Sequence, residues 1–189
     1  PQVGSVIKVP FVRVEWDLGI WYIPVMRFII VGTTNSANLL DGLDGLLTSV
    51  SMVDFATLAV LCGAASLGSL GVGCAAMCGA CMAFLSRNAY PAQMFMGDTG
   101  SLFLGGVIMG CAMMAGELLL FVLAGFVFVA DMLTSLLQRW YFRLTHGKRL
   151  FPIAPIHHSF EKWGFGEYAV MGLFAGVSAL FCVLAWFGK

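Results

Sequence analysis

Residues 35–46, NSANLLDGLDGL, lie between two apolar stretches and carry four side chains suited to hydrogen bonding. These side chains are Asn35, Asn38, Asp41 and Asp44. An Asx turn followed by a helix cap at Asp44 would explain one of the aspartates but neither asparagine. Four convergent polar groups at the mouth of an apolar segment favour a pocket for a hydrogen-bonding ligand, such as a nucleotide base and its ribose.

A second polar stretch, residues 88–101, reads NAYPAQMFMGDTGS. Asp98 is followed by Thr, Gly and Ser and then by a long apolar run, which is typical of the N-cap of a membrane helix. A carboxylate beside a helix N-terminus also suits Mg²⁺, which takes one or two carboxylates and completes its shell with water and substrate phosphate. Phe95 would be either an anchor at the bilayer interface or a stacking surface for a flat base. Taken without its neighbours, Phe95 favours the anchor interpretation.

The third polar stretch, residues 147–167, contains two adjacent histidines, His157 and His158. Two prolines that stiffen the chain precede them. Together with the basic residues upstream, these histidines could form an ordinary interfacial surface that titrates near neutral pH. They would equally suit donors to phosphate oxygens, or a proton-transfer role near a leaving phosphate. Metal binding by the histidines is less favoured, because the other two stretches offer oxygen ligands that prefer hard cations.

The composition is that of a membrane protein: of 189 residues, 60% are hydrophobic and 11% are charged. Ten basic residues balance ten acidic ones, so the net charge gives no sign of a nucleic-acid partner. The six cysteines all lie in or at the ends of apolar stretches, which predicts reduced packing residues instead of disulfides. Residues 74–81, CAAMCGAC, have the spacing of a radical S-adenosylmethionine cluster site, but helical spacing in an apolar run favours a packing stripe.

Six apolar segments approach the roughly 20 residues that a helix needs to cross a bilayer. They are residues 18–34, 46–62, 70–86, 101–116, 118–138 and 167–187. We therefore expect an all-α, polytopic transmembrane helix bundle over residues 18–189, with about five to six spans. Residues 5–17 alternate apolar and polar positions, so the segment 1–17 is expected to form a short β-hairpin or loop outside the bilayer.

Three polar connections separate these spans, at residues 35–45, 87–100 and 139–166. Two spans lie between each connection and the next, so all three must emerge on the same side of the membrane. The third connection holds half of the ten Lys and Arg residues, and the positive-inside rule then makes the shared side cytoplasmic. We expect the three connections to close around one site that a soluble cytoplasmic ligand can reach, with the hairpin on the extracytoplasmic side.

Three ionisable residues fall inside predicted spans: Arg27, Asp54 and Asp131. A charged group is costly in lipid, so each of them should face a protein interior or an interface. A membrane transporter that uses them as coupling groups at the bilayer midplane is the main alternative function from another class. A non-catalytic membrane scaffold is a third possibility.

The three polar stretches together resemble the phospho-N-acetylmuramoyl-pentapeptide transferase family, a branch of the polyprenyl-phosphate N-acetylhexosamine-1-phosphate transferase superfamily. NSANLLDGLDGL, NAYPAQMFMGDTGSLFLGG and PIAPIHHSFEKWG look like that family's successive cytoplasmic loop motifs, in the family's order. The superfamily shares the FMGD-x-GS core, whereas YPAQ before Asp98 and PIHH-x-x-E in the last stretch point to the muramoyl-pentapeptide branch. A related UDP-N-acetylhexosamine:polyprenyl-phosphate phosphosugar transferase is the alternative.

The resemblance implies a homodimeric enzyme with ten spans in the bacterial cell (inner) membrane, with its active-site loops in the cytoplasm. Such an enzyme transfers phospho-MurNAc-pentapeptide from UDP-MurNAc-pentapeptide to undecaprenyl phosphate with Mg²⁺. The products are UMP and lipid I, a step of peptidoglycan biosynthesis that serves cell shape and cell division.

The resemblance also implies roles for individual residues. Asp98 would be the magnesium-binding aspartate and Phe95 would stack on the uracil. His157 and His158 match the first two members of the family's histidine triplet and would contact phosphates. The residues expected to line the nucleotide pocket are Asn38, Asp41, Asp44 and Asn88, with Gln138 at the edge of the same cleft.

Two departures from the family pattern stand out. The triplet reads His-His-Ser here, so Ser159 either replaces the third histidine as a hydroxyl donor or shows that this position is dispensable. The family's paired aspartates have no counterpart, because the acids before residue 35 are Glu15 and Asp17, which parity places outside. The chain also has neither a start Met nor a hydrophobic leader. We therefore expect it to be the C-terminal part of the enzyme, with little or no activity alone.

Overall fold

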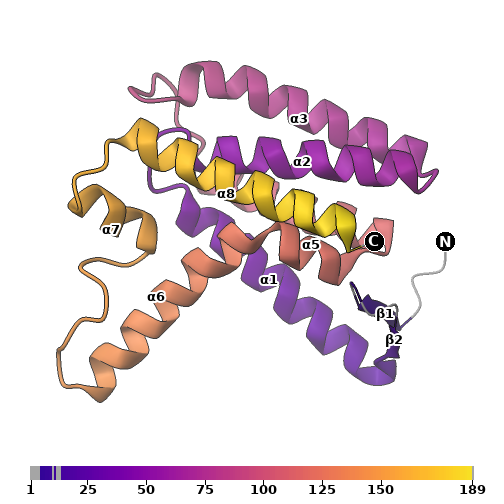
Figure 1. Ribbon diagram of the computed structural model, residues 1–189, viewed down its shortest axis with the longest axis horizontal. Helices are drawn as coiled ribbons and strands as arrows, with labels where there is room; N and C mark the ends of the chain where they lie inside the picture. The colour runs from indigo at the N-terminus through magenta and orange to yellow at the C-terminus, as the bar shows by residue number, and fades with distance from the viewer. Residues whose placement is uncertain (1–4, 10, 12–13, 189) are drawn as a thin grey trace.

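The computed structural model describes residues 5–9, 11 and 14–188, and these form eight α-helices, a two-stranded hairpin and one 3-10 turn (Figure 1). The strands are β1 (Val6–Val9) and β2 (Val14–Asp17), followed by the 3-10 turn Gly19–Trp21. The helices are α1 (Tyr22–Leu40), α2 (Leu46–Ala64), α3 (Gly68–Asn88), α4 (Gly97–Ala115), α5 (Leu118–Ala124), α6 (Phe126–Leu144), α7 (Ile156–Lys162) and α8 (Glu167–Phe187).

The hairpin is antiparallel, with Val6 opposite Asp17 and Val9 opposite Val14, as the alternation of apolar and polar residues predicts. The carboxylate of Asp17 fixes the start of the following turn, because it accepts hydrogen bonds from the hydroxyl of Ser5 and from the backbone N–H of Gly19. The hairpin therefore joins directly to α1.

Four helices are long and apolar enough to cross a membrane, namely α2, α3, α4 and α8. The bent pair α5 and α6 would make a fifth span, with an angle of 72° at the break. These helices confirm the predicted helical membrane bundle. The first predicted span corresponds to α1, which falls outside this set because Arg27 and the polar residues of its C-terminal half lower its hydropathy.

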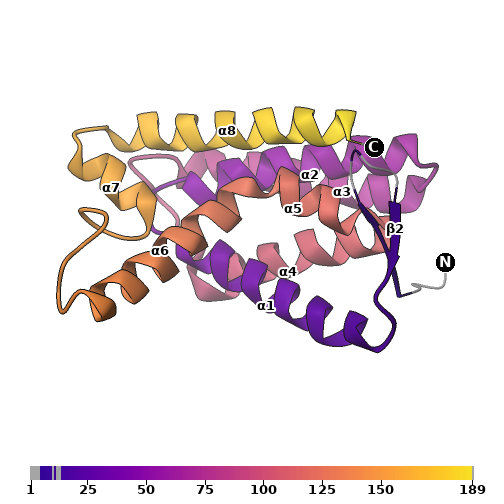
Figure 2. The same ribbon diagram turned by 60° about the horizontal axis from the view of Figure 1, so that its bottom comes forward.

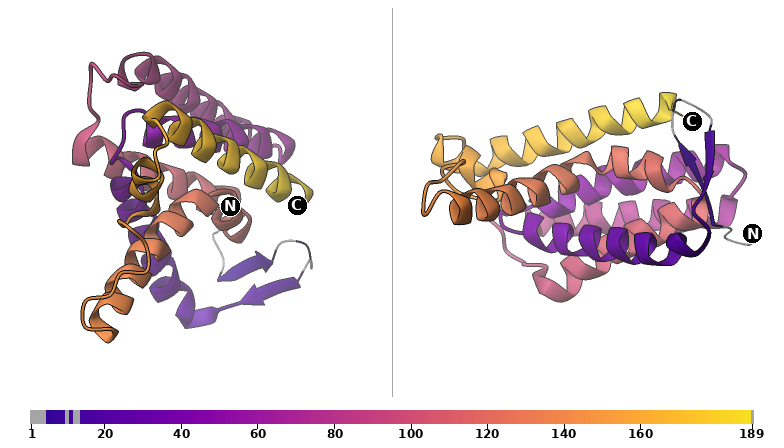
Figure 3. Two further views of the ribbon diagram at one scale, coloured as in Figure 1. Left: turned by 60° about the vertical axis from the view of Figure 1, so that its left-hand side comes forward. Right: turned by 90° about the horizontal axis from the view of Figure 1, so that it is seen from below.

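The predicted single span 118–138 is wrong in detail, since the chain breaks at Gly125 between α5 and α6. Glycine is a poor helix former, and Phe126 begins a new helix that diverges from α8 (Figures 1 and 3). A hydropathy pattern cannot reveal this break, because the residues on both sides of it are apolar. The break sends the second half of the predicted span, with Asp131, toward the end of the bundle that carries α7.

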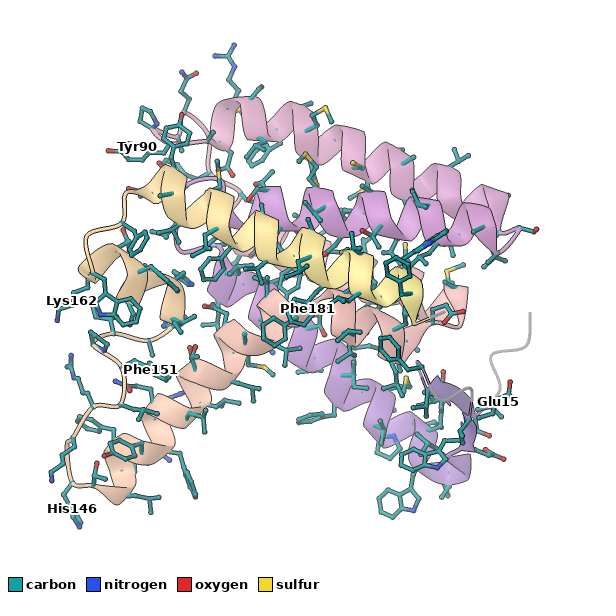
Figure 4. The ribbon with its side chains drawn as sticks, viewed as in Figure 1. Glu15, Tyr90, His146, Phe151, Lys162 and Phe181 are labelled. Atoms are coloured by element: carbon teal, nitrogen blue, oxygen red, sulfur yellow. The ribbon has the colours of Figure 1, made fainter. Side chains whose placement is uncertain are left out.

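The three polar connections lie at one end of the bundle, and the hairpin and the C-terminus lie at the other (Figures 1 and 2). Tyr90 on the α3–α4 connection, Phe151 before α7 and Lys162 at the end of α7 mark the first end, whereas Glu15 marks the other (Figure 4). This arrangement agrees with the count of spans. The side of the membrane that each end faces stays a prediction.

Helix α1 packs closely on α4 at Gly105. A Cβ atom on Gly105 would lie 2.9 Å from the Cβ of Ala37 and 2.9 Å from the Cα of Thr34. Only a residue without a side chain allows this approach. The contact holds the C-terminal half of α1 against the N-terminal half of α4.

Of the ionisable residues in the predicted spans, Asp54 and Asp131 are fully buried, as expected. Asp54 on α2 accepts a hydrogen bond of 2.8 Å from the hydroxyl of Ser178 on α8. Arg27 does not face a protein interior, because its side chain is exposed on the described part of the chain.

The six cysteines, all within the described residues, form no disulfide in the structure. Cys74 and Cys81 of the CAAMCGAC run are buried on α3. They pack in the hydrophobic core, as a packing stripe requires.

Candidate active site

Helix α1 continues through Leu40, so the predicted loop 35–45 is wrong for its first six residues and only 41–45 connects α1 to α2. The two asparagines therefore lie on a helix. The amide of Asn38 donates to Asp98 Oδ1 and to Ser101 Oγ on α4, at 3.0 Å each. Asn35 points elsewhere: it is exposed, and its amide donates to the carbonyl of Val31 at 2.8 Å. The structure thus brings Asn38 to the site and leaves Asn35 outside it.

Asp98 lies in the first turn of α4, whose N-cap position is held by Met96 without a side-chain hydrogen bond. The N-cap interpretation of Asp98 is therefore wrong, because its carboxylate is not used to close the helix. The carboxylate is oriented by Asn38 and is exposed at the positive end of the α4 dipole. It remains available to a ligand.

Asp41, half-buried in the α1–α2 connection, is close enough to Asp98 for the two negative charges to interact. Burial and, to a smaller extent, the negative charge of Asp98 together raise the pKa of Asp41 to about 6. Two carboxylates that repel each other form a natural site for a divalent cation. Within the described residues no three His, Cys, Asp or Glu side chains come together as a metal site. Two carboxylates with room for water and phosphate fit Mg²⁺ better than Zn²⁺.

The α3–α4 connection is held in place by two of the predicted pocket residues. Asp44 Oδ2 accepts a hydrogen bond of 2.9 Å from the backbone N–H of Ala92, so Asp44 bridges two connections instead of capping α2. Asn88 is buried, with its Oδ1 accepting from the hydroxyl of Thr48 at 2.6 Å and its amide donating to the carbonyl of Met94 at 2.9 Å. Both residues shape the site. Phe95, on the same connection, has 76% of its surface exposed, which leaves its ring free to stack.

The two histidines lie on α7, and each has a carboxylate at Nδ1. His157 is fully buried, with its Nδ1 2.9 Å from Asp131 Oδ1 and 3.1 Å from Oδ2. His158 is partly exposed, with its Nδ1 2.7 Å from Glu161 Oε2. A carboxylate that accepts the Nδ1–H hydrogen bond leaves Nε2 to accept or to donate a proton.

Both imidazole rings present Nε2 to the α1–α2 connection. A Cβ atom on Gly42 would lie 2.6 Å from Nε2 of His157 and 3.1 Å from Nε2 of His158. The Nε2 of His157 is buried and has no hydrogen-bond partner among the described residues. The histidines thus meet the segment that carries Asp41, and three segments distant in the sequence converge on one site.

Sequence reasoning missed the partners of the histidines. Glu161 could have been found, because residues three apart on a helix are neighbours. Asp131 was predicted to face a protein interior, but its partner is 26 residues away on another helix. That pairing depends on the break at Gly125 and on the path of the connection between α6 and α7.

Two further residues singled out in the sequence, Gln138 and Ser159, form hydrogen bonds to the backbone of the segment before α7. The amide nitrogen of Gln138 donates to the carbonyl of Phe151 at 2.9 Å, and its oxygen accepts from the N–H groups of Leu150 and Phe151. The hydroxyl of Ser159 bonds to both the N–H and the carbonyl of Ile153. Ser159 is fully buried, so it does not replace the third histidine as a donor to a ligand.

The sequence profile of glycosyl transferase family 4 matches residues 3–116, more than half of the chain. The chain belongs to glycosyl transferase family 4. Among curated relatives, it is 44% identical to the phospho-N-acetylmuramoyl-pentapeptide-transferase of Clostridium novyi and 45% identical to that of Clostridium kluyveri, with 98% of this chain covered in both. It is 43% identical to the one of Thermodesulfovibrio yellowstonii over 84% of this chain.

These relatives confirm the resemblance drawn from the three motifs and go against the transporter interpretation. This family 4 chain spans 57% of the length of the Clostridium novyi relative and 49% of the Thermodesulfovibrio one. The activity and the substrates of the whole enzyme are therefore treated below as proposals.

The raised pKa of Asp41 predicts a pH dependence of stability for this family 4 chain. The folded state binds a proton at Asp41 more readily than the unfolded state, whose pKa is near the ordinary 3.8. Stability from this group is therefore present below about pH 4 and is lost as the pH rises through about 6. In thermal unfolding of the detergent-solubilised chain, Asp41→Asn should raise the midpoint at pH 7.5 and have a smaller effect at pH 5. An equal change at both pH values would contradict the assignment.

Proposed function

We propose that this chain forms the nucleotide and metal site of a phospho-N-acetylmuramoyl-pentapeptide transferase in the bacterial inner membrane, with the site end in the cytoplasm. The enzyme would be a homodimer, with UDP-MurNAc-pentapeptide as donor and undecaprenyl phosphate as acceptor. The observation that carries the proposal is the convergence of Asp41, Asp98 and the Nε2 atoms of His157 and His158 from three separate segments.

The transfer forms a bond between an acceptor phosphate oxygen and the sugar-bearing phosphorus of the donor. It breaks the bond from that phosphorus to the bridging oxygen, so UMP leaves with that oxygen and its electron pair. Asp98 and Asp41 would hold Mg²⁺, with Asn38 orienting the carboxylate of Asp98. The metal, when bound, neutralises charge on the diphosphate and on the leaving UMP. Phe95 would stack on the uracil ring.

The histidines would act on the phosphate oxygens. Asp131 and Glu161 fix the two rings with Nε2 directed at Gly42, beside Asp41. A protonated Nε2 donates to an oxygen on which negative charge develops, and its fixed position spares the site reorganisation during transfer. Burial of His157 excludes water from this side of the cleft.

An apolar cavity of about 280 Å³ between α1 and α6 could hold part of the hydrocarbon chain of the acceptor. Phe28, Ile29 and Gly32 of α1 line it on one side, and Met132, Leu133 and Leu136 of α6 line it on the other. A polyprenyl chain in this cavity would place its phosphate near the ends of α1 and α7, where the cleft lies. We infer that the activation of the acceptor depends on the family's aspartate pair, and that the chain alone binds the nucleotide with little turnover.

The test is a hybrid protein in which residues 1–189 replace the matching segment of the Clostridium novyi relative. UMP release from UDP-MurNAc-pentapeptide should require both undecaprenyl phosphate and Mg²⁺, and UDP-N-acetylglucosamine should not serve as donor. A hybrid that is monodisperse in detergent but releases no UMP would contradict the proposal. Preferential use of UDP-N-acetylglucosamine would instead indicate the related superfamily branch.

The hybrid also tests the close approach of Gly42 to the histidines. Gly42→Ala places a methyl group against both Nε2 atoms, so the rings must shift away from the cleft. We expect UMP release to fall by roughly tenfold or more, because small displacements of catalytic groups are costly. The matched control is Gly106→Ala, since nothing lies within 4 Å of its added Cβ atom. Equal rates for the two variants would refute a role for this contact.

A further inference from the structure

A second cavity, of about 500 Å³, lies between α6, the end of α1 and the segment that leads to α7, next to the site described above. Its ten lining residues include Leu39, Ser135, Gln138, Arg139, Arg143 and Arg149. Three of these ten residues are arginines and none is acidic. Its volume falls in the range of ordinary ligand pockets, roughly 300–1,000 Å³.

The charge of this cavity is not compensated by the protein. Among the described residues, the salt bridges are two histidine–carboxylate pairs, and neither involves an arginine. Arg149 makes one long hydrogen bond, 3.4 Å, to the carbonyl of Pro152. Ser135 has only 7% of its surface exposed, yet its hydroxyl has no hydrogen-bond partner within the described part of the chain. A buried polar group without a partner and several uncompensated guanidinium groups together indicate a site for an anion.

The position of the cavity indicates which anion it takes. Leu39 follows Asn38 directly, and Pro155 lies two residues before His157, so the lining continues into the proposed nucleotide cleft on its histidine side. Leu136, Leu137 and Trp140 are exposed on the adjoining face of α6, which Arg139 and Arg143 also border. Because the cavity continues toward the histidines and its lining includes the polar side chains of Ser135 and Gln138, a hydrophilic part of the donor beyond its phosphates fits it.

We propose that this cavity binds carboxylate groups of the donor's peptide, an inference that rests on the proposed function. A peptide with a free C-terminus carries at least one carboxylate, and arginine binds carboxylates through two parallel hydrogen bonds. Arg139 and Arg143 follow each other by one turn of α6, and Arg149 is contributed by the segment that leads to α7. Gln138 keeps the segment around Phe151 folded, and Arg149 lies on that segment.

The test uses the whole chain, residues 1–189, in detergent with Mg²⁺. Calorimetry compares three ligands: UDP, UDP-MurNAc-pentapeptide, and the same donor with its peptide carboxylates converted to amides. We expect the free-acid donor to bind roughly tenfold more tightly than the amide. Arg139→Gln and Arg143→Gln should remove this preference without changing the affinity for UDP. Lys148→Gln, a basic residue of the same segment outside the cavity, should keep it.

Equal affinities for the acid and the amide in the unaltered chain would overturn the peptide site while leaving the nucleotide site intact. Parallel loss of UDP and donor binding in the arginine variants would also overturn it, because the arginines would then support the nucleotide or the fold. A separate titration uses the free pentapeptide alone. Peptide binding that depends on Arg139, in a chain that does not bind UDP, would support the cavity and refute the proposed function. The last outcome concerns lipid. If the unaltered chain showed no preference for the free-acid donor, and phosphatidylglycerol vesicles but not phosphatidylcholine vesicles displaced the peptide, the cavity would be assigned to lipid phosphate.

Discussion

Asp98→Asn in the hybrid protein is expected to reduce Mg²⁺-dependent UMP release by roughly 10²–10³-fold, the usual cost of removing one electrostatic contact to a transition state. An amide keeps the size of the side chain but removes the negative charge that Mg²⁺ requires. Asn38 and Ser101 remain to hold the residue in place, so the helix should not be disturbed. The measurement is the initial rate of UMP release at several Mg²⁺ concentrations.

The control for this variant is Glu15→Gln, which removes one exposed carboxylate at the opposite end of the bundle (Figure 4). The control should keep the rate and the Mg²⁺ dependence of the unaltered hybrid. If Asp98→Asn turned over normally at low Mg²⁺, Asp98 would not be a metal ligand and the mechanism above would be wrong.

Asp131→Asn is expected to lower the same rate by roughly 10²-fold, although Asp131 touches no substrate. Asp131 acts as a positioning residue through His157, because both of its oxygens lie near Nδ1 of that ring. An amide can present its NH₂ group to Nδ1, which favours the tautomer with the proton on Nε2 and weakens the protonated form. The pH profile of kcat/KM should therefore change shape, which a purely structural effect would not cause.

Two comparisons separate positioning from folding. In a double variant with His157→Gln, the loss from Asp131→Asn should disappear, since its effect is carried by the histidine. Asp54→Asn removes another fully buried carboxylate, on α2 and outside the site, and should leave the rate within about threefold of the unaltered hybrid. Additive losses in the double variant would show that Asp131 acts independently of His157.

The sequence was sufficient to predict the helical membrane class, the hairpin and the segments that build the site. These features depend on local patterns: hydrophobic length, alternation of apolar and polar residues, and short polar motifs between apolar runs. The family relation rests on the same motifs. The prediction that Asp98 is a ligand position also followed from its place at the start of a long apolar run.

The remaining features depend on contacts between distant segments. Asp44 reads locally as a turn or cap residue, but its partner is the N–H of Ala92 on another connection. Asn35 and Asn38 are three residues apart on one helix, and the packing of α1 on α4 at Gly105 decides that only Asn38 meets Asp98. No pattern within a single segment could give either result.

The most direct test of the central claim uses the chain's three histidines, His146, His157 and His158. With histidine-selective labelling, Mn²⁺ in place of Mg²⁺ and UDP added, the account predicts that the paramagnetic ion broadens the ring signals of His157 and His158 most. His146, on the connection after α6, serves as the internal control (Figure 4). Asp98→Asn should abolish the broadening. Broadening that is equal at all three histidines, or that persists in Asp98→Asn, would contradict a shared metal and nucleotide site.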